Sequence, residues 1–298
     1  MAVTLDQPLA SSALPRLLTL RTDRRRTLLD RFMRGLTVAA MVVCIIPLVA
    51  VIAYVTINGL AAINLDLLTK PPKALGVGGG AAAAILGSLQ MVSLATVMAV
   101  PAGILSSVYV SEFAGTRKAA GIRFAADVLA GVPSILVGIF TFTILVLPFQ
   151  QYNAFAGSVA LAIIMWPIVL RTTEEILALV PGTLREASLA LGVQRWRTVL
   201  SIVVRTGFTG ILTGVMLAVA RAAGETAPLL FTALGSRLIN VRDWQRPMDA
   251  LPLFIYQNAR QPYPVLNAQA WGAAFLLMLF VLVVNIAVRG RSMGRRTY

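Results

Sequence analysis

The chain has 298 residues, of which 58% are hydrophobic and only 13% charged, and its mean hydropathy is +0.81. Soluble domains average about half apolar and about a quarter charged residues, so this composition indicates an integral membrane protein. The sequence has no histidine, one cysteine (Cys44) and no G-x-x-x-x-G-K-[ST] loop. These absences exclude Ser-His-Asp catalysis, H-E-x-x-H zinc sites, a disulfide framework and ATP hydrolysis by this chain itself.

Residues 1–35 form a basic tail with seven arginines, centred on Arg24, Arg25 and Arg26. A nucleic-acid patch is one interpretation of such a cluster. Because three Asp residues are interleaved with the arginines, we favour juxtamembrane cations that are attracted to anionic membrane lipid. We therefore expect a cytoplasmic tail with lipid, and no nucleic acid, as its partner.

Six apolar stretches are long enough to cross a bilayer, which takes about 20 helical residues. They are residues 36–57, 84–110, the two halves of 128–170 on either side of a polar turn at 148–153, 206–235 and 268–288. Assigning the connections alternately to the two sides places nineteen of the 26 Lys and Arg residues on one side and six on the other. The positive-inside rule then predicts that both termini are cytoplasmic.

The connection between the fourth and fifth spans, about residues 171–205, is the most patterned polar segment. Thr183 and Glu186 have capping-box spacing and predict the start of a short helix, which Gly192 would end in a left-handed conformation. Residues 194–204 predict a second helix that leads directly into the fifth span. This arrangement fits a mechanical coupling element, or an ordinary helical hairpin on the membrane surface.

This connection resembles the EAA loop of ABC-importer permeases, E-A-A-x3-G-x9-I-x-L-P, at Glu186-Ala187-Ser188, Gly192 and Ile202. It departs from that pattern at Ser188 and at Val204-Arg205, where Leu-Pro is usual. The resemblance implies docking onto an ATPase subunit, which hydrolyses ATP with Mg while this chain binds no cofactor. The residues it implicates in coupling are Glu186, Ala187, Ser188, Leu189 and Gly192.

The fifth span contains two charged residues, Arg221 and Glu225, which are four positions apart and are expected to share a helix face. A charge at bilayer depth costs about 2.5–3.5 kcal/mol and usually faces a protein interior or a water-filled path. The Arg221 guanidinium matches a tetrahedral oxyanion, and Glu225 could accept a hydrogen bond from an anion that retains a proton, as phosphate does and sulfate does not. Alternatively, the two charges only neutralise each other.

Residues 220–234 resemble the A-R-x-x-G-E-T-A-P-L-L-F-T-A-L signature of the PstA-type permeases of phosphate ABC importers. The resemblance extends from about residue 81 to the C-terminus. It implies an all-α, six-span type I importer (MetI-like) permease fold and an ATP-driven import of phosphate through a bacterial cytoplasmic (inner) membrane. The translocation-path candidates are Arg221, Glu225, Thr226 and Arg171, although Arg171 could simply follow the positive-inside rule.

The same resemblance implies a set of partners. They are a second, PstC-type permease, two copies of an ABC ATPase and an extracytoplasmic phosphate-binding protein. The order of the spans predicts that residues 36–298 form the permease domain, with an outer loop at about 226–267 that docks the binding protein, gates the outer mouth or acts only as a spacer. Alternatives are a permease for sulfate or molybdate, and a self-contained channel or ion-coupled carrier.

Overall fold

A computed structural model describes residues 24–73, 77–239 and 243–293, and in this part of the chain every named element is a helix. Contacts divide the chain into an N-terminal unit, residues 1–54, and a larger unit, residues 55–298. Residues 1–23 of the expected basic tail lie outside the described residues. The elements are α1 (Arg24–Ala62), α2 (Leu65–Thr69), α3 (Ala82–Val108), η1 (Tyr109–Phe113), α4 (Thr116–Gly131), α5 (Ser134–Thr141), η2 (Phe142–Val146), α6 (Ala154–Ala178), α7 (Gly182–Ala190), α8 (Arg195–Thr198), η3 (Val199–Val203), α9 (Val204–Ala223), α10 (Ala227–Thr232), α11 (Leu251–Ala259) and α12 (Pro264–Met293).

Five described helices are long and apolar enough to cross a membrane, and a bent pair of helices makes a sixth possible span. The five are α1, α3 with η1, α6, α8 to α9, and α12. They correspond to the expected first, second, fourth, fifth and sixth spans. The chain is therefore an all-α, multi-pass membrane protein.

The expected third span is not a straight helix. Its residues lie in the last turn of α4, in α5 and in η2, and α4 meets the α5–η2 segment at an angle of 101°. Val132 is extended, with φ −69° and ψ 129°, and Pro133 follows it as the residue before α5. A proline disfavours helical backbone at the preceding residue and cannot donate a backbone hydrogen bond, so α4 ends there.

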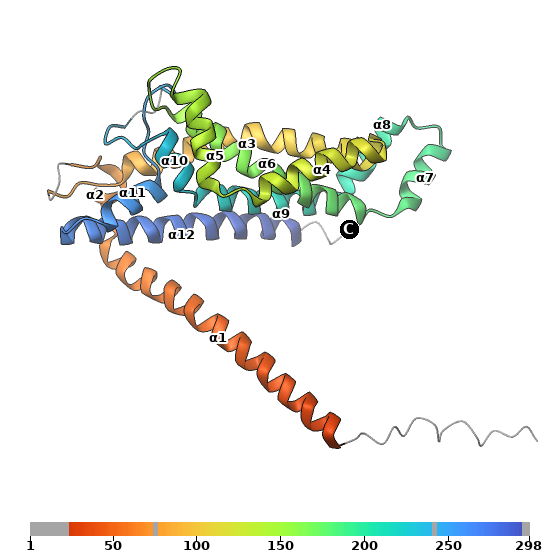
Figure 1. The fold of residues 1–298 in the computed structure, drawn as a ribbon, viewed down its shortest axis with the longest axis horizontal. Coiled ribbons are helices and arrows are strands. Elements are labelled where there is room, and N and C mark those ends of the chain that lie inside the picture. The colour runs from red at the N-terminus through yellow and green to blue at the C-terminus, as the bar shows by residue number, and fades with distance from the viewer. Residues whose placement is uncertain (1–23, 74–76, 240–242, 294–298) are drawn as a thin grey trace, which may run out of the picture. The chain divides into compact units, whose positions relative to one another are not determined.

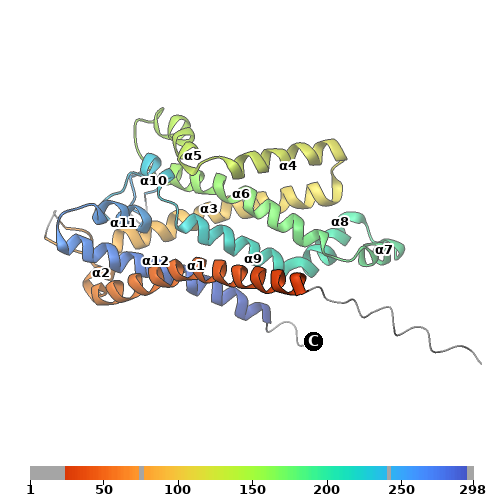
Figure 2. The same cartoon turned by 60° about the horizontal axis from the view of Figure 1, so that its bottom comes forward.

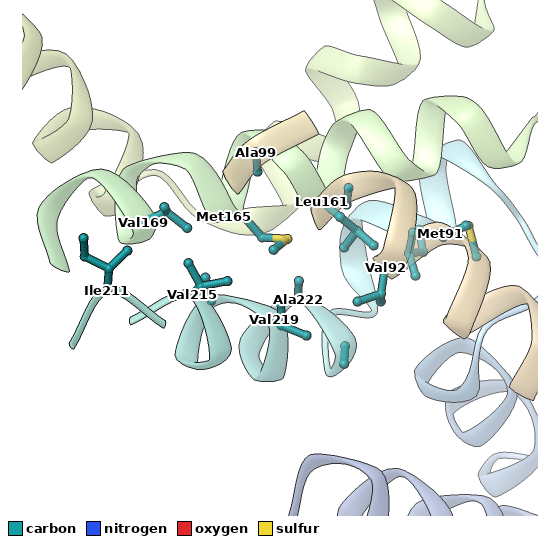
Figure 3. Packing of buried hydrophobic residues seen from close by; sticks show 14 of the residues in the cluster. Met91, Val92, Ala99, Leu161, Met165, Val169, Ile211, Val215, Val219 and Ala222 are labelled. Carbon is teal, nitrogen blue, oxygen red and sulfur yellow. The ribbon is translucent and has the colours of Figure 1, made fainter. Parts of the chain in front are cut away.

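The core of the larger unit lies where α3, α6 and α9 run alongside one another (Figures 1 and 2). Figure 3 shows Met165 and Val169 of α6 directed toward Val215 and Val219 of α9. Glycine allows the helices to approach closely: a Cβ on Gly103 of α3 would lie 2.7 Å from a Val169 methyl carbon. Small residues at such contacts are typical of membrane helices, where dispersion rather than the hydrophobic effect holds helices together.

The two ends of this bundle differ in structure (Figure 1). One end, called the α7 end here, is formed by η1, α7 and α8, and the other, called the α11 end, by α2, α10 and α11. At the α11 end the connection between α10 and α11 covers the start of α6. The N–H groups of Ala154 and Phe155 donate to the carbonyls of Arg246 and Trp244 at 3.0 and 3.1 Å. These bonds satisfy two of the donors that the first turn of a helix leaves free.

Candidate functional site

The two charged residues expected within the fifth span, Arg221 and Glu225, lie at a break in the helix rather than on one continuous helix. α9 ends at Ala223, Gly224 is its C-cap, and α10 begins at Ala227. The expectation that Arg221 and Glu225 share a helix face is therefore wrong, because Glu225 lies beyond the end of α9. Gly224 near the end of the helix and Pro228 in the first turn of α10 explain the break, since glycine favours helix ends and proline helix starts.

Arg221 and Glu225 form an ion pair, but a loose one. The Arg221 Nε and Glu225 Oε1 atoms are 3.7 Å apart, which is longer than a hydrogen bond. The Arg221 side chain is 58% exposed, whereas the Glu225 side chain is only 15% exposed. Among the described residues, the Arg221 side chain donates no hydrogen bond, so its planar set of donors is not used within this part of the chain.

The segment that follows the break is held by α5 and α6. A Cβ on Gly138 of α5 would lie 2.7 Å from the Pro228 Cα, and one on Gly157 of α6 would lie 3.2 Å from a Leu229 methyl carbon. Thr226, the residue before α10, is half-buried and its side chain makes no capping hydrogen bond. Non-helical backbone at membrane depth is tolerated where protein surrounds it or where it lines a cavity.

A cleft begins one turn before Arg221 on the same exposed face of α9. Thr213 and Leu217 lie on this face at four-residue intervals, and both are exposed. The cleft has a volume of about 470 Å³ and lies between α6, α9 and α12. Its polar lining residues are Thr172, Glu175, Thr213 and Asn285.

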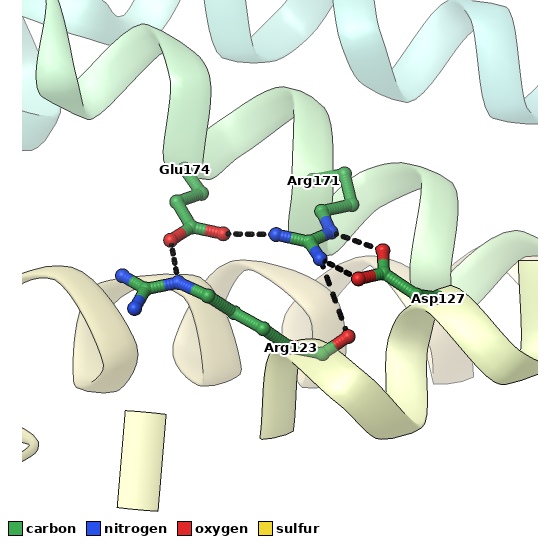
Figure 4. A network of polar contacts seen from close by, with 4 residues as sticks. All are labelled: Arg123, Asp127, Arg171 and Glu174. Atoms are coloured by element: carbon green, nitrogen blue, oxygen red, sulfur yellow. Dashed lines mark hydrogen bonds and ion pairs between the residues drawn. The ribbon is translucent and has the colours of Figure 1, made fainter. Parts of the chain in front are cut away.

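Arg171, the other cationic candidate, is fully engaged in a network that joins α6 to α4 (Figure 4). Its Nε atom donates to Asp127 Oδ1 at 2.9 Å, Nη1 donates to Glu174 Oε2 at 3.2 Å, and Nη2 donates to Asp127 and to the Arg123 carbonyl. Glu174 also accepts a bond from Arg123. Asp127 and Glu174 were not among the candidates by sequence, because Asp127 is 44 residues from Arg171 and no local pattern indicates the pairing.

The EAA-like segment forms α7, but its start differs from the prediction. The residue before the helix is Pro181 and no side-chain cap is made, so the capping box at Thr183 and Glu186 is wrong. Proline, which lacks an N–H and has a fixed φ, replaces it as the residue that starts the helix. The predicted end is confirmed, since Gly192 has φ +78° and the Val193 N–H donates to the Ser188 carbonyl.

The coupling candidates differ in exposure. Glu186, Ala187 and Leu189 are exposed on α7, and so is Gly192 after it. Ser188 is buried, and its hydroxyl lies 2.8 Å from the Thr198 hydroxyl of α8. Ser188 therefore joins the two short helices, while its neighbours on α7 remain accessible.

Asp249, in the connection between α10 and α11, is an acidic residue that the sequence did not single out. It is 4% exposed, and burial raises the pKa of its carboxyl from 3.8 to about 7 although the Ala250 N–H donates to it. No cluster of three or more His, Cys, Asp or Glu side chains suited to a metal ion occurs in the described ranges.

The sequence matches a family model described as the binding-protein-dependent transport system inner membrane component, over residues 99–290. The phosphate transport system permease protein PstA of Haemophilus influenzae is 39% identical over 261 residues, which cover 87% of this chain and 92% of that protein. PstA of Xylella fastidiosa is 43% identical, covering 78% and 81%. PstA 1 of Mycobacterium tuberculosis is 38% identical over 95% of this chain and 93% of its own, so the likeness extends well before residue 81.

Solved structures share the fold at lower sequence identity. An inward-facing MetNI methionine ABC transporter chain matches with a TM-score of 0.55 and 17% identity, over 72% of this chain and 94% of its own. A chain of a bacterial alginate ABC transporter, in complex with an alginate pentasaccharide-bound periplasmic protein, matches with a TM-score of 0.62 and 13% identity, over 92% and 98%. The chain therefore belongs to the family of binding-protein-dependent transport system inner membrane components and, within it, to the PstA-type permeases.

Proposed function

We propose that this chain is the permease subunit of an ATP-driven importer of inorganic phosphate and forms half of its translocation pore. The phosphate transport system permeases among its relatives support this role. The structural observation that carries the proposal is Arg221, whose side chain is 58% exposed at a break in a membrane helix and makes no hydrogen bond within the described part of the chain. Discontinuous helices of this kind frequently form substrate sites in transporters.

The chemistry of the pair suits phosphate. The planar guanidinium of Arg221 donates two parallel hydrogen bonds to two oxygens of a tetrahedral anion. Glu225 lies close enough to accept a hydrogen bond from the protonated oxygen that phosphate retains at neutral pH. A sulfate ion has no such proton and would place its charge against the carboxylate, so the pair selects against it.

Thr226 and Arg171 have different roles in this proposal. The Thr226 hydroxyl follows Glu225 directly and makes no capping bond, so it is a further donor for the anion. Arg171 belongs to the wall of the pathway rather than to the set of anion ligands. All three of its guanidinium nitrogens already donate to Asp127, Glu174 or the Arg123 carbonyl.

The proposed complex contains a second, PstC-type permease, two ATPase subunits that bind and hydrolyse ATP with Mg, and an extracytoplasmic phosphate-binding protein. Both termini and the α7 end face the cytoplasm of a bacterium, and lipid surrounds the apolar spans. The region of residues 171–205, with Glu186, Ala187, Leu189 and Gly192 accessible on and after α7, contacts the ATPase, and Ser188 keeps α7 against α8. Residues 226–267 face outward. This subunit itself is not an enzyme.

Gentle purification of the chain from its native membrane, with identification of the co-purifying proteins, tests this assignment. An ATPase and a second permease in stoichiometric amounts are the expected result. Replacement of Glu186 and of Gly192 should then reduce recovery of the ATPase, whereas replacement of the exposed Arg117 on α4 should not. A chain that is purified alone and transports phosphate without an ATPase would contradict the proposal.

A further inference from the structure

A cluster of charged residues at the α7 end joins η1, α7 and α8. From the sequence alone, the arginines of this cluster indicate only which side of the membrane the segment faces. Arg185 lies on α7 and Arg195 on α8, and both contact Glu112 of η1, which is more than 70 residues away in sequence. Glu112 is 8% exposed, and the side chain of Arg185 is 25% exposed. A buried carboxylate is costly unless it is paired, so this contact is a specific structural feature.

Two nitrogens of Arg185 bind the same oxygen of Glu112, and Arg185 also contacts the end of α6. The Arg185 Nε and Nη2 atoms donate to Glu112 Oε1 at 3.0 and 2.8 Å. Its Nη1 and Nη2 atoms also donate to the carbonyls of Val180 and Leu177 at 2.7 and 2.9 Å. Leu177 lies in the last turn of α6 and Val180 follows the end of this helix, where the helix dipole favours a cation.

Arg195 completes the connection from the other short helix. It donates to the Glu112 carbonyl, and its guanidinium carbon lies 5.4 Å from the centre of the Phe113 ring. Ser188 and Thr198 join α7 to α8. Consequently α7 is attached to the end of the α3–η1 helix and to the end of α6, as well as through α8 to α9.

We propose that Glu112 and Arg185 are positioning residues that transmit displacement of α7 to the α3–η1 helix, so that ATP-driven motion reaches the core helices α3 and α6 directly. The inference rests on the proposed function, in which α7 contacts the ATPase. Without the Glu112–Arg185 contact, α7 remains attached to the bundle through α8 and α9. The ATPase would then still bind and hydrolyse ATP, but less of its motion would reach the pore.

The test uses the whole complex reconstituted in liposomes with its binding protein, and the measured quantity is phosphate imported per ATP hydrolysed. For Glu112→Gln and Arg185→Gln we expect full recovery of the ATPase and a fall in this ratio of about fivefold or more, the usual scale of a coupling between sites. Arg185→Lys, which retains the charge but not the fork, should be intermediate. The double variant should be no worse than Arg185→Gln alone, because that single variant already removes the Glu112–Arg185 contact.

The matched control is Arg117→Gln, which removes an exposed cation from α4 at the same end of the bundle. A ratio in the Glu112 and Arg185 variants equal to that of the control would overturn the inference. So would loss of the ATPase from all of these variants, including Arg185→Lys, because the contact would then serve assembly alone. The unaltered complex is assayed first. If it imports no phosphate, the proposed function is wrong, and this outcome is distinct from a failure of the inference about Glu112 and Arg185.

Discussion

Variants of Arg221 test whether this residue binds an anion or only pairs with Glu225. If Arg221 binds phosphate, Arg221→Ala removes two hydrogen bonds to a charged group, and each is worth about 1.5–3 kcal/mol. The loss of about 3–6 kcal/mol corresponds to a decrease of about 100-fold to 10,000-fold in transport efficiency, since 1.4 kcal/mol is a factor of ten. Arg221→Lys keeps the charge and one donor direction, so we expect a decrease of only about 10-fold to 100-fold.

The structure predicts a different result for stability. The Arg221–Glu225 pair is 3.7 Å apart, and the arginine side chain is 58% exposed. A pair this exposed contributes at most about 1 kcal/mol after screening by solvent. Thermal unfolding of the purified complex should therefore change little in either variant, while uptake of radiolabelled phosphate into liposomes falls.

The double variant Arg221→Ala with Glu225→Gln distinguishes the two interpretations of the pair. If Arg221 only neutralises Glu225, removal of both charges should restore uptake. If it binds the anion, uptake should remain as low as in Arg221→Ala. Restoration of uptake by the double variant, or unchanged uptake in Arg221→Ala with the complex intact, would show that Arg221 does not bind the anion.

Three further predictions concern stability. In Gly87→Ala the new Cβ would lie 2.0 Å from the Asp249 carbonyl oxygen, so thermal unfolding in detergent should show a loss of about 1–3 kcal/mol or more. Gly121→Ala, in open space in the interior of α4, should instead stabilise the protein by about 0.5–1 kcal/mol, because alanine favours a helix interior over glycine. Gly192→Ala has space for its Cβ but must adopt φ +78°, so we expect a cost of about 1–2 kcal/mol and faster amide exchange at the end of α7. Because the pKa of Asp249 is raised from 3.8 to about 7, the folded protein binds its proton more tightly, and stability should fall as pH rises between these values and level off above them. Asp249→Asn should remove this pH dependence; an unchanged pH profile would contradict the burial argument.

The sequence predicts the approximate positions of five spans, the first, second, fourth, fifth and sixth, because hydropathy depends only on local composition. It also predicts the end of α7 at Gly192 and the continuity of α8 with α9, since both follow from local backbone preferences. The bend between α4 and α5 had a local signal in Pro133 that hydropathy does not register. The break after α9 likewise had signals in Gly224 and Pro228.

The ion pairs could not be predicted in the same way. Arg171 contacts Asp127 and Arg185 contacts Glu112 across separations of 44 and 73 residues, and these contacts depend on how the helices pack. The positive-inside rule only assigns both arginines to the cytoplasmic side of the membrane. The structure instead distinguishes a fully engaged Arg171 from an Arg221 whose donors are available.

Uptake of radiolabelled phosphate by liposomes that contain this chain with its co-purified permease and ATPase subunits, in the presence of the binding protein, is the decisive test of the proposed function. We expect uptake that requires ATP, that persists in an excess of sulfate or molybdate, and that falls by about 100-fold or more in Arg221→Ala. Uptake that proceeds without ATP, that sulfate or molybdate abolishes, or that is unaffected by the loss of Arg221 would contradict it.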